Sequence, residues 1–149
     1  MTLYLDASAL AKAYLAELGS SDVIQMLAAT TVAATSAVAY AELRALFARA
    51  TREGRITAHE LTTTIALLDE RWARYSIVAV DDARLREAGA LAERHPRHAL
   101  RALDTLHLAS ALRISAGEPA PITFACWDLR LWRAARDEGF TMLPAAEPV

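Results

Sequence analysis

The chain has 149 residues, a formal net charge of −2 and a sequence pI of about 6.1. Hydrophobic residues make up 54% and charged residues 23%, which excludes a disordered chain. A protein that holds nucleic acid by bulk charge is more basic, so that mode of binding is excluded too. The length suits one folding unit, and we expect a single domain over residues 1–149.

Apolar runs alternate with helical patterns from end to end. The expected strands are residues 3–5, 32–35, 77–80, 122–126 and 140–143. The expected helices are residues 8–18, 20–29, 36–53 with Ser36 as cap, 57–75, 82–93, 102–115 and 129–138. Strands this short and this apolar are typical of a parallel sheet that helices cover on both faces. We therefore predict a three-layer α/β/α domain with a mostly parallel central sheet.

Residues 23–41 carry no charge and are nearly long enough to cross a bilayer. Thr30, Thr31 and Ser36 interrupt the stretch, so we interpret it as a buried helix, strand and helix. The first residues lack the basic region of a signal peptide. The single cysteine, Cys126, excludes an intrachain disulfide and shows no zinc-ligand spacing with the four histidines. We expect a cytoplasmic protein without a membrane segment.

Two acidic residues directly follow predicted strands. Asp6 comes after the first strand and Asp128 after the fourth, and sites of parallel sheets lie beyond the carboxyl ends of their strands. Each could instead be a helix N-cap, although Ser8 is available to cap the first helix. For Asp128 the two interpretations stay open. Asp81 and Asp82 also follow a strand, and we interpret them as a turn residue and a helix cap.

Glu42 lies inside a predicted helix, on an apolar face. Val38 and Leu46, four residues before and after it, are both apolar and share its side of the helix. A carboxylate that faces the protein interior without a partner is costly. The alternative is that Glu42 extends to solvent at the edge of the stripe, or pairs with a nearby arginine such as Arg44 or Arg49. We favour a functional role.

Asp104 repeats this pattern near the start of another apolar helix. Leu100 and Leu108 lie four residues to either side, so the carboxylate should be buried. Its alternative role is again an N-cap. His107 falls on the same face, where a lone histidine is more often a hydrogen-bonded core residue than a ligand.

The four carboxylates together predict metal-dependent chemistry. If they converge, their mutual repulsion is relieved by a cation, and ligands that are all oxygen select Mg²⁺ or Mn²⁺ over zinc. Carboxylate clusters of this kind support two-metal hydrolysis of phosphodiesters, with ions roughly 4 Å apart. One ion activates the attacking water and the other stabilises the leaving oxygen.

The ordered set of motifs resembles the PIN-domain family over essentially the whole chain. The motifs are Asp-Ala-Ser-Ala-Leu from Asp6, the mid-helix Glu42, Leu-Asp-Thr-Leu-His-Leu-Ala around Asp104, and Trp-Asp-Leu-Arg-Leu around Asp128. Within the family the chain looks most like a VapC-type toxin of a bacterial toxin–antitoxin pair. The resemblance implies strand order 3-2-1-4-5 and a Mg²⁺-dependent endoribonuclease, with Mn²⁺ as a substitute. It further implies that the four acids bind metal and that Ser8 forms hydrogen bonds beside them.

The same resemblance implies an RNA substrate, a cognate VapB-like antitoxin whose tail enters the active site, and a homodimer. One departure concerns the fourth motif, where Cys126 stands in place of the usual Thr or Ser two residues before Asp128. The thiol is a weaker hydrogen-bonding group. Contact with RNA would be local, and Arg101 and Arg130 are the arginines nearest the acids.

Three other functions compete with the toxin hypothesis. A HAD-like phosphatase also begins with an Asp after its first strand, but it needs a second Asp where this chain has Ser8. A non-catalytic PIN module that binds RNA or protein would have no need of four acids. A PIN nuclease outside toxin–antitoxin systems is the third alternative.

Overall fold

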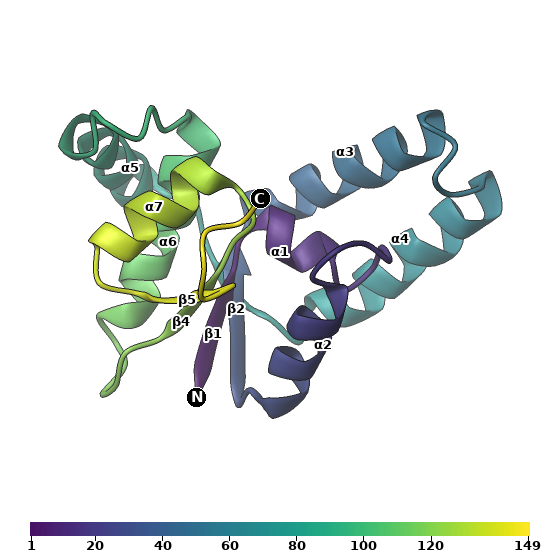
Figure 1. Cartoon of the computed structure of the whole chain (residues 1–149), viewed down its shortest axis with the longest axis horizontal. Helices are drawn as coiled ribbons and strands as arrows, with labels where there is room; N and C mark the ends of the chain where they lie inside the picture. Colours follow the sequence, from purple (N-terminus) through teal and green to yellow (C-terminus); the bar gives the residue numbers. More distant parts are fainter.

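A computed structural model describes residues 1–149 and contains a five-stranded sheet in the order β3-β2-β1-β4-β5. All four strand pairings are parallel, and Figure 1 shows the sheet in the middle of the molecule. The strands are β1 (Thr2–Leu5), β2 (Val32–Ser36), β3 (Ser76–Val78), β4 (Thr123–Ala125) and β5 (Thr141–Leu143). The predicted fold class and strand order are confirmed.

Seven helices cover the two faces of this sheet. They are α1 (Ala7–Ala11), α2 (Ser20–Ala29), α3 (Val38–Arg52), α4 (Ala58–Trp72), α5 (Asp82–Arg94), α6 (Ala102–Ser115) and α7 (Leu129–Asp137). Helices α1 to α4 pack on one face and α5 to α7 on the other, as Figure 1 shows. The arrangement is the predicted three-layer one.

The side chains of β1 explain why two separate cores form. Leu3 and Leu5 point into the core beneath α1 to α4, whereas Tyr4 points into the core beneath α5 to α7. All three are fully buried, and burial of each apolar side chain is worth about 1.5–3 kcal/mol. Because β1 is buried on both faces, the run from Leu3 to Leu5 carries no charge and is apolar on both sides, which is the pattern that identified it.

Helices α3 and α4 form a hairpin that projects away from the sheet (Figure 1). Gly54, with φ +71°, ends α3 in the left-handed conformation that favours glycine. Thr57 and Glu60 then begin α4 with reciprocal hydrogen bonds: Glu60 N donates to Thr57 Oγ1 at 3.1 Å, and Thr57 N donates to Glu60 Oε2 at 2.7 Å.

The first helix is shorter than predicted. It ends at Ala11 instead of residue 18, and the next turns close through i→i+3 hydrogen bonds such as Lys12 N to Ala9 O at 3.1 Å. Polar contacts hold this bend, because Lys12 Nζ contacts Glu17 Oε1 at 2.9 Å and Ser20 Oγ donates to Leu15 O at 2.9 Å. Such contacts depend on the folded path of the chain, so helix periodicity did not indicate them.

The caps of three helices are now defined, and two of them differ from the prediction. Asp6, one of the two candidates, caps α1 because its carboxylate accepts from Ala9 N at 2.8 Å. Ser36 is the last residue of β2, and Ala37 occupies the N-cap position of α3. Asp81 caps α5 by accepting from Arg84 N at 2.9 Å, and Asp82 is the first residue of that helix.

The uncharged stretch 23–41 divides into most of α2, the strand β2 and the start of α3, as predicted. None of the helices combines the length and the apolar character that crossing a membrane requires.

Candidate active site

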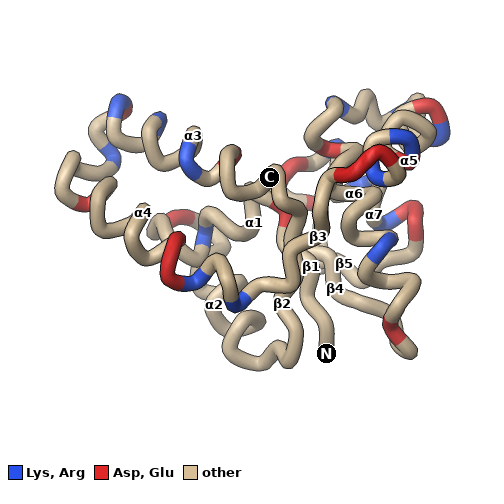
Figure 2. The backbone as a smooth tube through the Cα atoms, turned by 180° about the vertical axis from the view of Figure 1, so that it is seen from behind, with Lys and Arg blue, Asp and Glu red and all other residues tan.

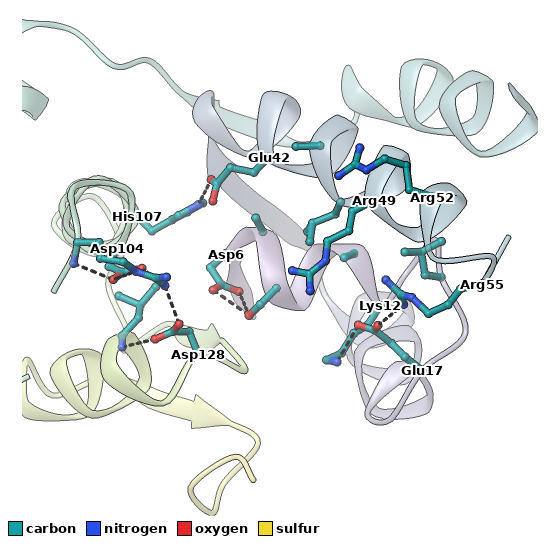
Figure 3. Close-up of a pocket in the computed structure, with 18 residues that line it drawn as sticks. Asp6, Lys12, Glu17, Glu42, Arg49, Arg52, Arg55, Asp104, His107 and Asp128 are labelled. Carbon is teal, nitrogen blue, oxygen red and sulfur yellow. Dashed lines mark hydrogen bonds and ion pairs between the residues drawn. The ribbon is translucent and has the colours of Figure 1, made fainter. Parts of the chain in front are cut away.

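A cavity of about 530 Å³ opens at the carboxyl edge of the sheet. Its walls include all five residues that the sequence singled out, and they come from every layer of the fold (Figure 3). Asp6 follows β1, Glu42 lies on α3, Asp104 lies on α6 and Asp128 precedes α7. Figure 2 shows acidic positions in the middle of the molecule and basic positions along α3.

Asp6 is the most enclosed of the four acids, with 4% of its surface exposed. Ser8 Oγ lies 2.8 Å from Asp6 Oδ1 and 2.9 Å from Oδ2, and the Ala9 amide donates to Oδ1. Burial raises the pKa of the Asp6 carboxyl above its usual value, although the positive influence of His107 and these hydrogen bonds oppose the effect. The side chain is therefore both a helix cap and a buried acceptor that favours a nearby positive charge.

Ser8 and Cys126 connect Asp6 to the start of α7. Ser8 Oγ accepts from Trp127 N at 2.8 Å, so one hydroxyl joins the first and fourth motifs. The Cys126 thiol lies 3.3 Å from Asp6 Oδ2 and equally close to Asp128 O. Burial raises the pKa of this thiol, which keeps its proton available for donation. The Cys126 thiol thus joins the Asp6 carboxylate to the backbone of Asp128.

Glu42 is held by a histidine instead of an arginine. Its Oε1 lies 2.7 Å from His107 Nε2, and His107 Nδ1 lies 2.9 Å from the hydroxyl of Tyr4. His107 is 2% exposed, and the Glu42 side chain is 21% exposed. Glu42 therefore lies at the border of the cavity with a fixed orientation. The alternative pairing with Arg44 or Arg49 does not form, and the interpretation of His107 as a hydrogen-bonded core residue is confirmed.

Arg101 lies between the two remaining acids. Its Nε contacts Asp104 Oδ2 at 3.1 Å, and its Nη2 contacts Asp128 Oδ2 at 2.8 Å. Asp104 is buried as predicted and also accepts from the Arg101 backbone N at 2.8 Å. Asp128 caps α7 through Arg130 N and Leu131 N, so its two interpretations hold together: it is a cap that also lines the cavity.

The four acids border one cavity, but no three of them bring their oxygens within 4.8 Å of one another. Arg101 partly explains this spacing, because a guanidinium occupies the place between Asp104 and Asp128. The donor set suits a hard cation, since every candidate ligand atom is a carboxylate oxygen. Asp6 is buried and has no cationic side chain in hydrogen-bond contact. A bound cation would therefore offset the cost of its buried negative charge more than that of the other acids.

The other end of the cavity is basic. Arg49, Arg52, Arg55 and Lys12 line it, and Glu17 accepts from Lys12 at 2.9 Å (Figure 3). The sequence showed the arginines on one helix and its end but gave no indication that they share a cavity with the acids. Lys12 was missed altogether, because the bend after α1 is what brings it there.

The parallel sheet has the order β3-β2-β1-β4-β5, and acidic side chains surround one cavity at its carboxyl edge. These two features define a PIN-like α/β domain. The PIN domain family matches residues 3–117, and the chain belongs to this family.

Two relatives from Mycobacterium tuberculosis share most of its length. Ribonuclease VapC45 (strain CDC 1551 / Oshkosh) and Ribonuclease VapC49 (strain ATCC 25618 / H37Rv) are each 36% identical over 143 residues, covering 96% of this chain and 95% of the relative.

Solved structures resemble the fold at lower identity. FitAcB from Neisseria gonorrhoeae matches with a TM-score of 0.63 and 19% identity, covering 90% of this chain and 93% of that one. VapBC2 from Rickettsia felis, bound to a DNA fragment from their promoter, matches with a TM-score of 0.61 and 15% identity, covering 89% and 92%. At such identities the likeness concerns the fold alone.

Proposed function

We propose that the protein is a metal-dependent endoribonuclease and the toxin of a toxin–antitoxin pair. The observation that carries the proposal is the single cavity in which four carboxylates from all three layers face a basic end. Membership of the PIN family and the name Ribonuclease VapC of two relatives support the same reaction class.

Asp6, Glu42, Asp104 and Asp128 would hold Mg²⁺, or Mn²⁺ in its place. When bound, the cation supplies a water activated for attack and positive charge against the phosphate in the transition state. The chain's own part is to fix the acids: Ser8 and the start of α1 orient Asp6, and His107 orients Glu42. Orientation that exists before the substrate binds lowers the reorganisation that the reaction needs.

The basic end of the cavity supports RNA as the substrate. Arginine forks bind phosphate oxygens in pairs, so Arg49, Arg52 and Arg55 would hold the strand on one side of the bond that is cut. This contact is local, and therefore consistent with a chain whose net charge is −2.

An antitoxin partner and a homodimer belong to the same proposal. The structural neighbours carry names of two-component assemblies, FitAcB and VapBC2, which supports a partner that binds this fold. A VapB-like antitoxin that fills the acidic cavity would silence the enzyme.

The test is cleavage of a mixed cellular RNA pool by the purified chain in Mg²⁺, in Mn²⁺ and in EDTA. Asp6→Asn removes a cavity carboxylate, and Asp22→Asn is the matched control because Asp22 is exposed on α2. We expect discrete products that need metal, vanish in Asp6→Asn and persist in Asp22→Asn. Induced expression should arrest bacterial growth with wild type and not with Asp6→Asn.

Equal product patterns from wild type and Asp6→Asn would overturn the proposal, because the cleavage would then come from a contaminant. The absence of products with both metals would favour the non-catalytic PIN module instead. Metal-dependent cleavage without growth arrest would favour a PIN nuclease outside toxin–antitoxin systems.

A further inference from the structure

A second cluster of metal-ligating side chains lies outside the cavity. His95 and His98 stand in the connection between α5 and α6, and Asp137 and Glu138 stand at the end of α7. One potential ligand atom each from His95, His98 and Asp137 lies within 4.8 Å of the others, and the chain has no other such trio. The fold creates this proximity, since about 40 residues separate the histidines from the carboxylates.

The contacts within the cluster are close. His98 Nε2 lies 2.7 Å from Asp137 Oδ2, and His95 Nε2 lies 2.6 Å from Glu138 Oε1. The two imidazole rings are 5.7 Å apart between centroids and tilted by 33°. Glu138 thus orients the His95 ring, as a carboxylate beside a metal-ligating histidine does, and Asp137 and His98 lie close enough to share one ion.

The two histidines of the cluster are enclosed, whereas the Asp137 side chain is 46% exposed. The side chain of His95 is 9% exposed and that of His98 is 15% exposed, and a hollow of about 250 Å³ without hydrophobic residues adjoins them. Three arginines oppose a cation here: Arg94 contacts Glu138 at 2.8 Å, Arg136 contacts Asp137 at 3.8 Å, and Arg97 lines the hollow. Since Arg94 engages Glu138, Asp137 is the carboxylate left for the ion.

We propose that His95, His98 and Asp137 form a second metal site, which takes a borderline transition-metal ion of the zinc class. Two imidazoles and one carboxylate are ligands that Zn²⁺ accepts, whereas Mg²⁺ prefers oxygen alone. Glu138 holds the His95 ring, and solvent completes the coordination. The site does not depend on the proposed ribonuclease activity.

The ion would join two segments that lead to the active site. His98 is three residues before Arg101, and Asp137 is the last residue of α7, the helix that Asp128 caps. A metal bridge between the α5–α6 connection and α7 would therefore fix the end of the connection that carries Arg101 against the helix that carries Asp128. The role of the second ion is structural.

The experiment measures Zn²⁺ binding to the full chain by calorimetry, after stripping with EDTA and in excess Mg²⁺. The excess Mg²⁺ occupies sites made only of oxygen and leaves a histidine site free. Variants are His98→Gln and Asp137→Asn, and His59→Gln is the control because His59 is exposed on α4. We expect saturable Zn²⁺ binding in wild type and His59→Gln that is lost in the other two.

A measurement on the unaltered chain covers the case in which a variant fails to fold. The NMR signals of the His95 and His98 rings should shift when Zn²⁺ is added, whereas those of His59 should stay. Unchanged His95 and His98 signals, or Zn²⁺ binding that persists in folded His98→Gln, would overturn the proposal. Binding that Asp6→Asn abolishes would assign the ion to the acidic cavity and also overturn it.

Discussion

Replacing Arg101 with Gln removes the positive charge between two acids of the cavity. The guanidinium contacts Asp104 at 3.1 Å and Asp128 at 2.8 Å, so it fills the space between them. If these acids bind a cation, then Arg101 and the cation compete. The substitution should weaken the metal-free protein and strengthen its affinity for metal.

The loss of stability expected in Arg101→Gln follows from how exposed the paired side chains are. The Arg101 side chain is 58% exposed, which reduces the value of its ion pairs, but the Asp104 side chain is only 8% exposed. Asp104 keeps its hydrogen bond from the backbone N of residue 101, because Gln has the same amide. We expect a loss of about 1–2 kcal/mol in free energy of unfolding, roughly 2–8 °C in Tm for a chain of this length.

The assay is thermal unfolding in EDTA and in saturating Mn²⁺, with Mn²⁺ affinity measured separately. The difference in Tm between wild type and Arg101→Gln should close in Mn²⁺, because the cation replaces the lost charge. Affinity for Mn²⁺ should rise about 5- to 30-fold, the factor that corresponds to 1–2 kcal/mol. Arg86→Gln breaks an exposed ion pair with Asp82 and should change neither quantity. A Tm difference that is equal in EDTA and Mn²⁺, together with unchanged affinity, would refute the competition.

Two further predictions concern stability. Gly19→Ala should lower the free energy of unfolding by about 2 kcal/mol or more. Gly19 has φ +89°, and an added Cβ would lie 2.6 Å from the Trp127 ring. Urea unfolding that matches wild type would contradict this. Burial raises the pKa of Asp6 in the folded chain, so metal-free stability falls as pH rises through that pKa. Asp6→Asn should therefore be the more stable protein at neutral pH in EDTA, and that advantage should shrink in acid; a wild-type Tm above that of Asp6→Asn at pH 7 would contradict it.

The strands and most helices were predictable because each buries a regular set of apolar positions. The run around Tyr4 is apolar on both faces, and this marks a central parallel strand whatever surrounds it. The end of α1 was not predictable, because the bend rests on Lys12 and Glu17 meeting in space. The strand order came from the resemblance and not from periodicity, which carries no information about neighbouring strands.

The sequence identified the four acids of the site. It treated helix capping and a role in the site as alternatives for Asp6 and Asp128, whereas each side chain performs both. Asp6 and Asp128 each cap a helix with one carboxylate oxygen and present the other to Cys126 or Arg101. Capping and site roles are compatible because a carboxylate has two oxygens. The partner of Glu42 was missed, since His107 lies 65 residues further along the chain and only the fold brings α3 and α6 together at the carboxyl edge of the sheet.

The hydrogen-bonded line from Tyr4 through His107 to Glu42 crosses all three layers at the rim of the cavity. Tyr4 belongs to one hydrophobic core, whereas Glu42 is carried by a helix that packs over the other. The spacing of the acids therefore depends on how the two helical layers pack against the sheet. A core substitution such as Phe47→Ala, which removes a fully buried ring beneath α3, would therefore shift Glu42 relative to the other acids. The rate of the proposed reaction would fall even in a variant that still folds.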